Sequence, residues 1–525
     1  MGKEEQIVVD IRNAIPRIAE LRFATPVNWR IERGQQWAVI GPNGAGKTLL
    51  ADLTQRKYAL KEGEIRFGGE EKNGSFIKRI AFKDIYSLTD NQDSYYQQRW
   101  HSTETDNLPT VADLLKGFKG TRHLSEMLTF FGIEDFLPKK ILFLSSGELR
   151  KFLIVRTLLS RPHILIIDNP FIGLDAPSRT LLVEMLERMT KLEDTQIILL
   201  LSDPKDIPSM ITHVLPIHER TCFPPMRRED FLADKSLIAH LFPTEGEDTQ
   251  TLKQIELPVD KNRVPSTHKV TLRMEKVKIQ YGSRIILKDV DWEVRNGEKW
   301  ALSGPNGSGK STLLSLVYAD NPQSYANTLY LFDRKRGSGE SIWDIKKRIG
   351  YVSPEMHLYY KENVPALSIV SSGFFDSIGL FRKCDTQQEE VALNWMRVFG
   401  IEHLRNRLFL TLSSGEQRLI LLARAFVKDP DLIILDEPLH GLDISNKKKA
   451  ATIIERFCER PGKTLIYVTH YPHEVPPCVN KRFELTGIPH IPTSGNSCNQ
   501  NVNEGMYPCT SNNKAPYRAT SPFDK

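Results

Sequence analysis

The chain has 525 residues, of which 40% are hydrophobic and 26% are charged. These fractions are near the averages of soluble globular proteins, which excludes a fibrous or wholly disordered chain. No apolar run approaches the roughly 18 residues that a membrane-spanning helix needs. The net charge of +6 is spread along the chain and gives no strong signal for nucleic-acid binding. Six cysteines without a CxxC pair are typical of free thiols in a reducing compartment, so we expect a cytoplasmic protein.

The first predicted strand, Trp37–Ile40, is followed by a glycine-rich loop. Residues 41–48 read GPNGAGKT and match the pattern G-x-x-x-x-G-K-[ST]. The glycines let backbone N–H groups turn toward phosphate oxygens, and the helix that follows adds the positive end of its dipole. Lys47 would reach the β- and γ-phosphates, and the Thr48 hydroxyl would ligate Mg²⁺. The predicted nucleotide-binding residues of this loop are Gly41, Pro42, Asn43, Gly44, Ala45, Gly46, Lys47 and Thr48.

A later predicted strand, Ile164–Asp168, ends in a carboxylate that would hold magnesium through water opposite the phosphate loop. The next residue is Asn169, whose amide donates and accepts hydrogen bonds but cannot act as a base. Before this strand, the residues LSSGE at 144–148 precede an amphipathic run. This combination predicts a helix N-terminus, which is a favourable site for an anion.

After a polar, proline-containing segment at 245–269, the chain repeats itself. Residues 291–310 match residues 28–47 at ten of twenty positions, and LSSGE returns at 412–416. Each copy alternates apolar strands with helical patterns, which predicts an α/β unit with a mostly parallel sheet. We therefore predict the following division: a first domain at 1–244, a linker at 245–269, a second domain at 270–490 and a disordered tail at 491–525.

The second copy carries the same motifs with one change in the chemistry. Its phosphate loop, GPNGSGKS, follows an apolar strand, and its strand Leu432–Asp436 again ends in a predicted magnesium-holding carboxylate. Here the next residue is Glu437, a carboxylate able to polarise water for attack on a γ-phosphate. Lys310 would contact the phosphates, and Ser311 would ligate Mg²⁺ with Asp436. The predicted binding residues of this loop are Gly304, Pro305, Asn306, Gly307, Ser308, Gly309, Lys310, Ser311 and Thr312.

The order of these motifs resembles the ATP-binding cassette (ABC) family, whose signature helix is preceded by LSGGQ. The resemblance implies two P-loop ATPase domains of ABC type, each a mostly parallel sheet with an α-helical signature subdomain. In this family two cassettes pack head to tail, so that each ATP lies between the phosphate loop of one and the signature of the other. The signature residues expected to contact ATP in this way are Ser145 and Gly147 for the second loop and Ser413 and Gly415 for the first.

Further family positions are matched in the second half. Asp443 follows the strand carboxylates in a GLD triplet, and His470 ends a later strand where the family places a histidine that contacts the γ-phosphate. Tyr281 lies where the family has an aromatic residue stacked on adenine, with an ordinary core or surface tyrosine as the alternative. The resemblance therefore implies Glu437, His470 and Lys310 as catalytic residues.

The first half departs from the family pattern although it keeps Asp175. Asn169 replaces the glutamate, Ser202 stands where the histidine is expected, and Ile18 falls at the position of the aromatic residue. Loss of a general base typically costs about 10² to 10⁴ in rate. We therefore predict that the nucleotide on Lys47 is bound but turned over slowly and that the nucleotide on Lys310 is hydrolysed.

A second departure concerns the glutamine that most transport cassettes carry between phosphate loop and signature, facing the permease. Residues 351–355 of the second half read YVSPE and offer none, and the first half has only Gln97 and Gln98 as distant candidates. The soluble tandem arrangement, together with the segments SYYQQRW at 94–100 and IGYVS at 349–353, is similar to the bacterial ModF (PhrA-like) group of the family. Docking to a permease is left open by these residues.

The leading hypothesis is a cytoplasmic ATPase that binds ATP and Mg²⁺ between two paired cassettes and uses hydrolysis to drive a conformational cycle. One alternative is the energising subunit of a membrane transporter with a separate permease, which would place the protein at the inner membrane. Another is a ribosome-associated translation factor of the ABC-F type, but its long helical linker is not matched by residues 245–269. The process that hydrolysis would drive is not written in the sequence.

Overall fold

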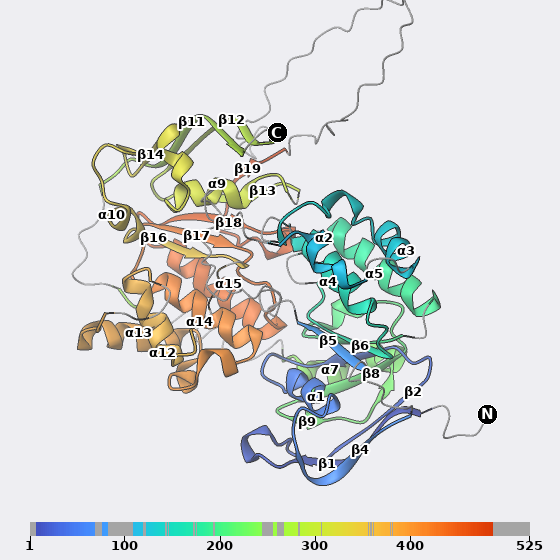
Figure 1. Ribbon diagram of the computed structural model, residues 1–525. Coiled ribbons are helices and arrows are strands. Elements are labelled where there is room, and N and C mark those ends of the chain that lie inside the picture. The colour runs from blue at the N-terminus through green and yellow to red at the C-terminus, as the bar shows by residue number, and fades with distance from the viewer. Residues whose placement is uncertain are drawn as a thin grey trace, which may run out of the picture.

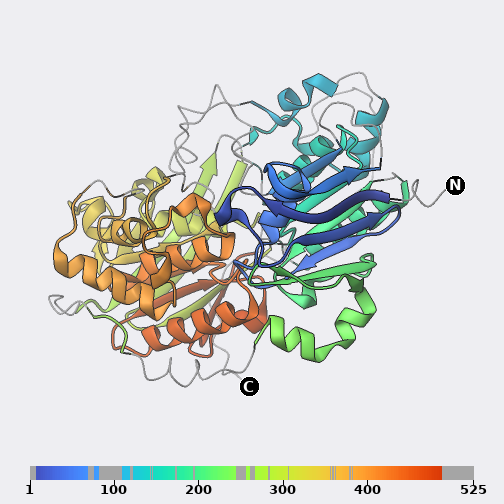
Figure 2. The same ribbon diagram turned by 90° about the horizontal axis from the view of Figure 1, so that it is seen from below.

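The computed structural model shows two lobes that lie side by side in both views of Figures 1 and 2, blue to green for the first copy and yellow to red for the second. The structure describes the following residues: 7–68, 76–81, 109–118, 122–141, 144, 146–171, 174, 176–192, 195–243, 256–259, 267–281, 284–305, 307–354, 356, 360, 362–377, 380 and 382–486.

The first lobe contains a small antiparallel sheet and a larger, mostly parallel one. The antiparallel sheet has the order β2-β1-β4, and the larger sheet has the order β10-β8-β3-β7-β6-β5, with β9 on β8. The bounds are β1 Ile7–Pro16, β2 Val27–Glu32, β3 Trp37–Ile40, β4 Leu60–Phe67, β5 Ile77–Ala81, β6 Ile164–Asp168, β7 Gln196–Leu201, β8 His213–His218, β9 Thr221–Cys222 and β10 Met226–Arg227.

The second lobe repeats this topology. Its antiparallel sheet has the order β12-β11-β14-β15, and its parallel sheet the order β16-β17-β18-β13-β19, which is the order β5-β6-β7-β3-β8 of the first lobe. The predicted duplication of an α/β unit is therefore present in the strand order. The bounds are β11 Val270–Tyr281, β12 Arg284–Arg295, β13 Lys299–Ser303, β14 Thr328–Leu331, β15 Arg334–Lys335, β16 Ile349–Val352, β17 Leu432–Asp436, β18 Thr464–Val468 and β19 Lys481–Glu484.

The central parallel strands are mostly apolar because helices or the antiparallel sheet cover both of their faces. All residues of β3, β6, β7, β17 and β18 are buried. β3 and β6 both pair in parallel with β7, and β13 and β17 both pair in parallel with β18. Parallel strands end at the same edge of a sheet, so the loops after β3 and β6 lie together, as do those after β13 and β17. This edge is where the phosphate loops and strand carboxylates were predicted to meet.

Helices complete each lobe and form a separate helical region before each signature helix (Figure 1). Those of the first lobe are α1 Lys47–Thr54, α2 Val111–Leu114, α3 Arg122–Phe131, α4 Ser146–Leu158, α5 Ala176–Leu192, α6 Arg228–Ala233 and α7 Lys235–Leu241. Those of the second are α9 Lys310–Val317, α10 Ile342–Lys346, α12 Ala366–Ser371, α13 Thr386–Val398, α14 Ser414–Phe426 and α15 Ile444–Cys458. Short 3₁₀ turns, including Pro204–Asp206 and Pro472–Glu474, connect several of them.

Of the predicted linker, the structure describes residues 267–269 and, further upstream, residues 256–259. The guanidinium of Arg460 donates to the carbonyl oxygens of Leu257 at 2.6 Å and Pro258 at 3.1 Å, which fastens this part to the second lobe. The predicted tail lies outside the described residues. The domain boundaries at 244, 269 and 490 stay predictions.

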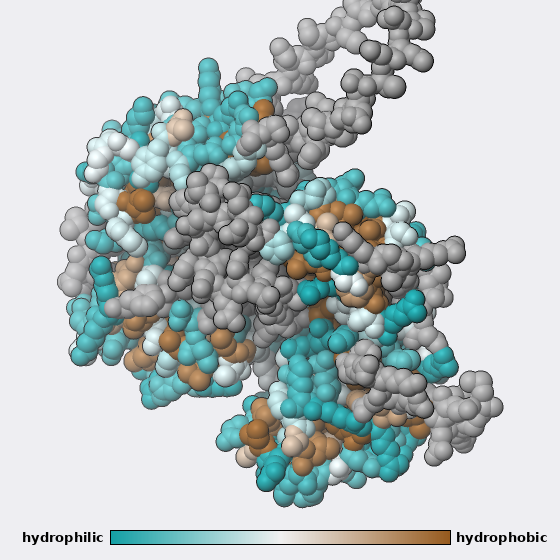
Figure 3. Space-filling view, viewed as in Figure 1, coloured by the Kyte–Doolittle hydropathy of each residue, from teal (hydrophilic) through white to brown (hydrophobic). Residues whose placement is uncertain are grey.

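On the face shown in Figure 3, hydrophilic side chains predominate and hydrophobic ones form separate groups. Within the described part of the chain, every helix is too short or too polar to cross a bilayer. The described cysteines, Cys222, Cys384, Cys458 and Cys478, are free thiols.

Candidate functional site

The first phosphate loop turns sharply between β3 and α1. Gly41 leaves no room for a side chain, because an added Cβ would lie 1.9 Å from the Ile217 carbonyl oxygen, and Gly46 has a left-handed backbone with φ of 107°. Lys47 is buried, and its Nζ donates to the carbonyl oxygens of Gly41 at 2.7 Å and Pro42 at 2.8 Å. Burial lowers the Lys47 pKa to about 8, against the opposing effect of nearby carboxylates. The ammonium group therefore lies inside the loop where phosphate was predicted.

The second phosphate loop has the same geometry. Gly309 is left-handed with φ of 97°, and Lys310 Nζ donates to the carbonyl oxygens of Gly304 at 2.8 Å and Pro305 at 2.9 Å. Ser308 is buried, and its hydroxyl has no hydrogen-bond partner among the described residues. A buried hydroxyl without a partner is costly, which favours a polar ligand at this loop.

The strand carboxylates lie beside the phosphate loops. The Thr48 hydroxyl donates to Asp168 Oδ2 at 3.2 Å, which brings together the two predicted magnesium ligands of the first lobe. In the second lobe, Ser311 is the second residue of α9, and Asp436 is buried at the end of β17. Hydroxyl and carboxylate oxygens are the donors that Mg²⁺ prefers, so these residues fit the ion.

Asn169 and Glu437 follow the two strand carboxylates with the same backbone conformation. Their φ angles are 50° and 49°, in the left-handed region, which is more strained for glutamate than for asparagine. The Asn169 amide donates to Asp168 at 3.0 Å. The exchange of glutamate for asparagine therefore changes the chemistry of this position without changing its backbone.

Glu437 is buried and contacts two histidines. Its Oε1 lies 3.1 Å from His470 Nε2, and its Oε2 lies 2.6 Å from His440 Nδ1. Burial opposes ionisation, but His440 and His470 outweigh this effect and hold the Glu437 pKa well below its usual value. The carboxylate is therefore ionised at neutral pH, as a base must be.

The two lobes meet at Asn43 in the first phosphate loop. The Asn43 backbone N–H donates to Asp443 Oδ2 at 2.9 Å, and its side-chain amide donates to the Gly441 carbonyl oxygen at 3.0 Å. Gly415, at the start of α14, lies against the same side chain, since an added Cβ would be 2.1 Å from Asn43 Nδ2. The signature of the second lobe thus faces the phosphate loop of the first, as the head-to-tail arrangement requires.

A methyl group at position 415 is expected to separate these surfaces. In Gly415→Ala, the new Cβ would lie 2.1 Å from Asn43 Nδ2 and 2.7 Å from Asn43 Cβ. The Asn43 side chain must therefore move and lose its hydrogen bond to the Gly441 carbonyl oxygen. Overpacking of this kind typically costs about 1–3 kcal/mol. We expect less labelled ATP to remain in the first pocket after gel filtration. Gly117→Ala, where an added Cβ meets nothing within 4 Å, is the matched control and should retain as much nucleotide as the original chain; equal retention by both variants would contradict the expectation.

The signature helix α14 is fixed to the loop that carries Glu437. Ser413 caps the helix by accepting from the Glu416 backbone N–H, and Glu416 completes a capping box. Arg418 is buried and donates to the carbonyl oxygens of Ser353, Asp436, Glu437 and Pro438. Burial lowers the Arg418 pKa to about 10, while Glu437 and Asp436 oppose the shift. One side chain therefore joins the signature of one nucleotide pocket to the strand end of the other.

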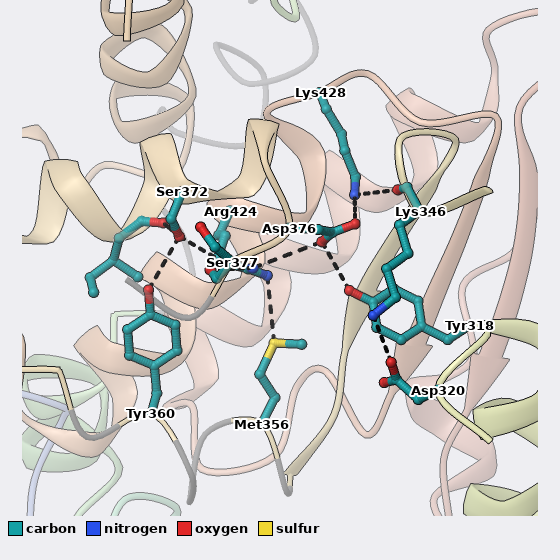
Figure 4. Close-up of polar contacts among 11 residues, drawn as sticks. Tyr318, Asp320, Lys346, Met356, Tyr360, Ser372, Asp376, Ser377, Arg424 and Lys428 are labelled. Atoms are coloured by element: carbon teal, nitrogen blue, oxygen red, sulfur yellow. Dashed lines mark hydrogen bonds and ion pairs between the residues drawn. The ribbon is translucent and has the colours of Figure 1, made fainter. Parts of the chain in front are cut away.

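A buried ion-pair network fixes the far end of α14 to α9 (Figure 4). Asp376 accepts a hydrogen bond from the Tyr318 hydroxyl at 2.9 Å and forms an ion pair with Lys428 Nζ at 2.5 Å. Arg424 Nη2 lies 3.8 Å from Asp376 Oδ1. Tyr318 is the C-cap residue directly after α9, and Lys428 follows the C-cap of α14. Arg156, aligned with Arg424 in the first lobe, has a buried guanidinium nitrogen without a partner among the described residues.

A cavity of about 290 Å³ lies between the lobes and is lined by both. Two ion pairs at aligned positions face it: Arg179–Asp206 at 2.8 Å and Lys447–Glu474 at 3.0 Å. Burial opposes the charge of Lys447, but Glu474 raises its pKa above the usual value. The Tyr471 hydroxyl reaches across to the Leu174 carbonyl oxygen at 3.5 Å. Arg179–Asp206 joins α5 to the loop after β7, and Lys447–Glu474 joins α15 to the loop after β18.

Some predicted residues are not brought into these clusters. Tyr281 is half-buried at the end of β11, and its hydroxyl accepts from Asn321 Nδ2 at 3.0 Å, so its proposed contact with adenine stays a prediction. Gly147 lies on α4, which begins at Ser146. Gly44, Ala45, Gly307 and Thr312 lie within the two phosphate-loop turns and the first turn of α9. Predicted residues outside the described part of the chain are Ser145, Asp175, Asn306, Gln97 and Gln98.

Sequence reasoning missed Arg418 and His440. Arg418 follows LSSGEQ in a run of apolar residues, where its burial depends on carbonyl oxygens that are distant in sequence. His440 had a detectable signal, since it stands three residues after Glu437 in the segment that ends at Asp443.

Comparison with known proteins places these features in one family. The profile described as ABC transporter matches residues 24–172 and 287–440. The chain is 34% identical over 467 residues to the ABC transporter ATP-binding protein ModF of Escherichia coli (strain K12), covering 87% of this chain and 92% of that protein. It is 29% identical over 482 residues to an uncharacterized ABC transporter ATP-binding protein of Schizosaccharomyces pombe, covering 87% and 94%.

Solved structures show a similar fold. A chain from the crystal structure of the complex of archaeal ribosomal stalk protein aP1 and archaeal ribosome recycling factor aABCE1 matches with a TM-score of 0.51. The match covers 92% of this chain and 88% of that chain at 18% identity. At this identity the likeness concerns the fold alone.

Proposed function

Because the chain belongs to the ABC transporter family of ATP-binding proteins, we propose that it binds two ATP molecules between its cassettes and hydrolyses mainly the one on Lys310. The observation that carries this proposal is the contrast between aligned positions. The second cassette has a buried, ionised Glu437 beside His470, whereas the first has Asn169 and Ser202. A carboxylate can accept a proton from water, but an amide cannot.

The head-to-tail pairing is supported by the contacts of Asn43. Nucleotide on Lys47 would lie between the first phosphate loop and the residues Ser413 and Gly415 of the second signature. By the same arrangement, nucleotide on Lys310 would be covered by Ser145 and Gly147. We propose this second contact from the duplication, since Ser145 lies outside the described residues.

In the proposed reaction, the phosphate-loop amides and Lys310 bind the phosphates of ATP, and His470 contacts the γ-phosphate. Glu437 orients the attacking water and accepts its proton. Magnesium held with Ser311 and Asp436, or with Thr48 and Asp168 in the first pocket, would neutralise charge on the phosphates. Release of phosphate from one pocket would weaken the contact between cassettes, and this change of state would drive a partner.

Paired lysine variants test the assignment of the two pockets. Lys310→Ala is expected to abolish phosphate release by the purified chain, while labelled nucleotide is still retained on the first loop after gel filtration. Lys47→Ala, the aligned change, is expected to remove the retained nucleotide and to reduce turnover less. Hydrolysis that follows Lys47 instead of Lys310 would overturn the proposal.

The partner is to be identified with the slow variant. We propose a cytoplasmic location, with attachment to the inner membrane only if a permease binds. Affinity isolation of Glu437→Gln with ATP should retain whatever recognises the ATP-bound state. A co-isolated polytopic membrane protein would support a transporter subunit, and co-isolated ribosomes would support the ABC-F alternative.

A further inference from the structure

His440 lies between the proposed base and the first cassette. Its Nδ1 is 2.6 Å from Glu437 Oε2, and both side chains are 8% exposed. An ionised carboxylate only accepts hydrogen bonds, so Nδ1 carries the proton and donates it. A short, charge-assisted bond between two buried groups restricts the carboxylate to one orientation.

The His440 ring and the residue after it both contact groups that reach the first cassette. The ring packs edge-on against the Tyr471 ring, with centroids 5.4 Å apart, and Tyr471 reaches the first cassette at Leu174. The following residue, Gly441, accepts from the Asn43 amide of the first phosphate loop. The position of His440 therefore depends on contacts that both cassettes make.

The two carboxylate oxygens of Glu437 have different partners. Oε1 is 3.1 Å from His470 Nε2, and we expect His470 to move toward the γ-phosphate when ATP binds. Oε2 is hydrogen-bonded to His440, which lines the cavity between the lobes. If His470 turns to phosphate, His440 is the remaining described side chain that fixes the carboxylate. In the sequence of the first cassette, the residue aligned with His440 is Ile172, three positions after Asn169. The cassette with the glutamate therefore carries the histidine, and the cassette with the asparagine does not.

We propose that His440 is a positioning residue that orients Glu437 toward the attacking water through its Nδ1–H. This inference rests on the proposed function, because it needs Glu437 as the base. His440 does not touch nucleotide in this role. It acts by keeping the carboxylate within reach of the water, and misplacement of a reacting group by about 1 Å costs on the order of 100-fold in rate.

Two substitutions at this position separate the hydrogen bond from side-chain bulk. His440→Leu fills similar space without a donor, whereas His440→Asn keeps an N–H at the place of Nδ1. His440→Leu is expected to lower kcat about 10- to 100-fold with KM for ATP unchanged. His440→Asn is expected to recover most of the lost kcat. Thermal denaturation and ATP binding of each purified full-length variant show that the fold and the pockets are intact.

His473→Leu is the matched control. His473 also lines the cavity and packs against Tyr471, with ring centroids 5.7 Å apart, but His473 is exposed, whereas His440 is buried. Its substitution is expected to leave kcat and KM unchanged.

The outcomes distinguish this inference from the proposed function. Unchanged kcat in His440→Leu, or equal losses in His440→Leu and His440→Asn, would overturn the positioning role while a strong loss in Glu437→Gln keeps the proposed function. A rise in KM at constant kcat would also overturn it, because the defect would then be in binding. Full activity of Glu437→Gln would overturn both.

Discussion

Glu437→Gln is expected to lower kcat for ATP hydrolysis by about 10² to 10⁴, the usual loss when a general base is removed. Glutamine keeps the size of the side chain and can still contact His440 and His470, but its amide cannot accept a proton from water. ATP binding should therefore persist while turnover slows. Phosphate release under steady-state conditions gives kcat, and equilibrium binding of labelled ATP shows that the pocket is intact.

The aligned substitution in the first cassette is the control. Asn169→Gln alters the residue after Asp168 without removing a base, so we expect little change in kcat. The amide of Asn169 donates to Asp168, and glutamine offers the same donor on a longer side chain. Equal losses from the two substitutions would show that hydrolysis is shared between the pockets or assigned to the wrong one.

Arg418→Leu is expected to lower the stability of the second cassette by about 3–5 kcal/mol, because it removes a buried cation that donates to four backbone carbonyl oxygens and is attracted by the charges of Glu437 and Asp436. The carbonyl oxygens of Asp436 and Glu437 would lose this donor in a place where water is excluded. In a domain of this size, such a loss lowers the unfolding temperature by roughly 10 °C. Scanning calorimetry of the full chain measures the change.

A surface arginine on the same helical region provides the comparison. Arg397 on α13 pairs with Glu402 at 2.9 Å, and its side chain is 54% exposed. Exposed ion pairs contribute little because water and salt screen them. Arg397→Leu should leave the unfolding temperature unchanged within experimental error. If Arg418→Leu unfolded at the same temperature as Arg397→Leu, the buried contacts of Arg418 would not be stabilising.

The fold could be predicted from the sequence because its signals are local and repeated. The apolar runs at Trp37–Ile40, Ile164–Asp168 and Leu432–Asp436 are strands in the structure with the predicted bounds. Strands of a parallel sheet are buried on both faces, so their composition alone marks them. The repeated order of strand, glycine-rich loop and helix then gave the family and the fold class, which the comparisons confirm.

The candidate site could be predicted only as far as each motif is continuous in the chain. The sequence by itself determined the two phosphate loops, the carboxylates after the strands, and the difference between Asn169 and Glu437. Only the tertiary structure decided which lobe faces which loop, through Asn43, Gly415 and Asp443, and which side chains hold Glu437 and the signature helix. The physical reason is that a backbone turn and a burial pattern are set by neighbours along the chain, whereas hydrogen bonds such as those of Arg418 and His440 depend on groups that folding brings within about 3 Å of each other.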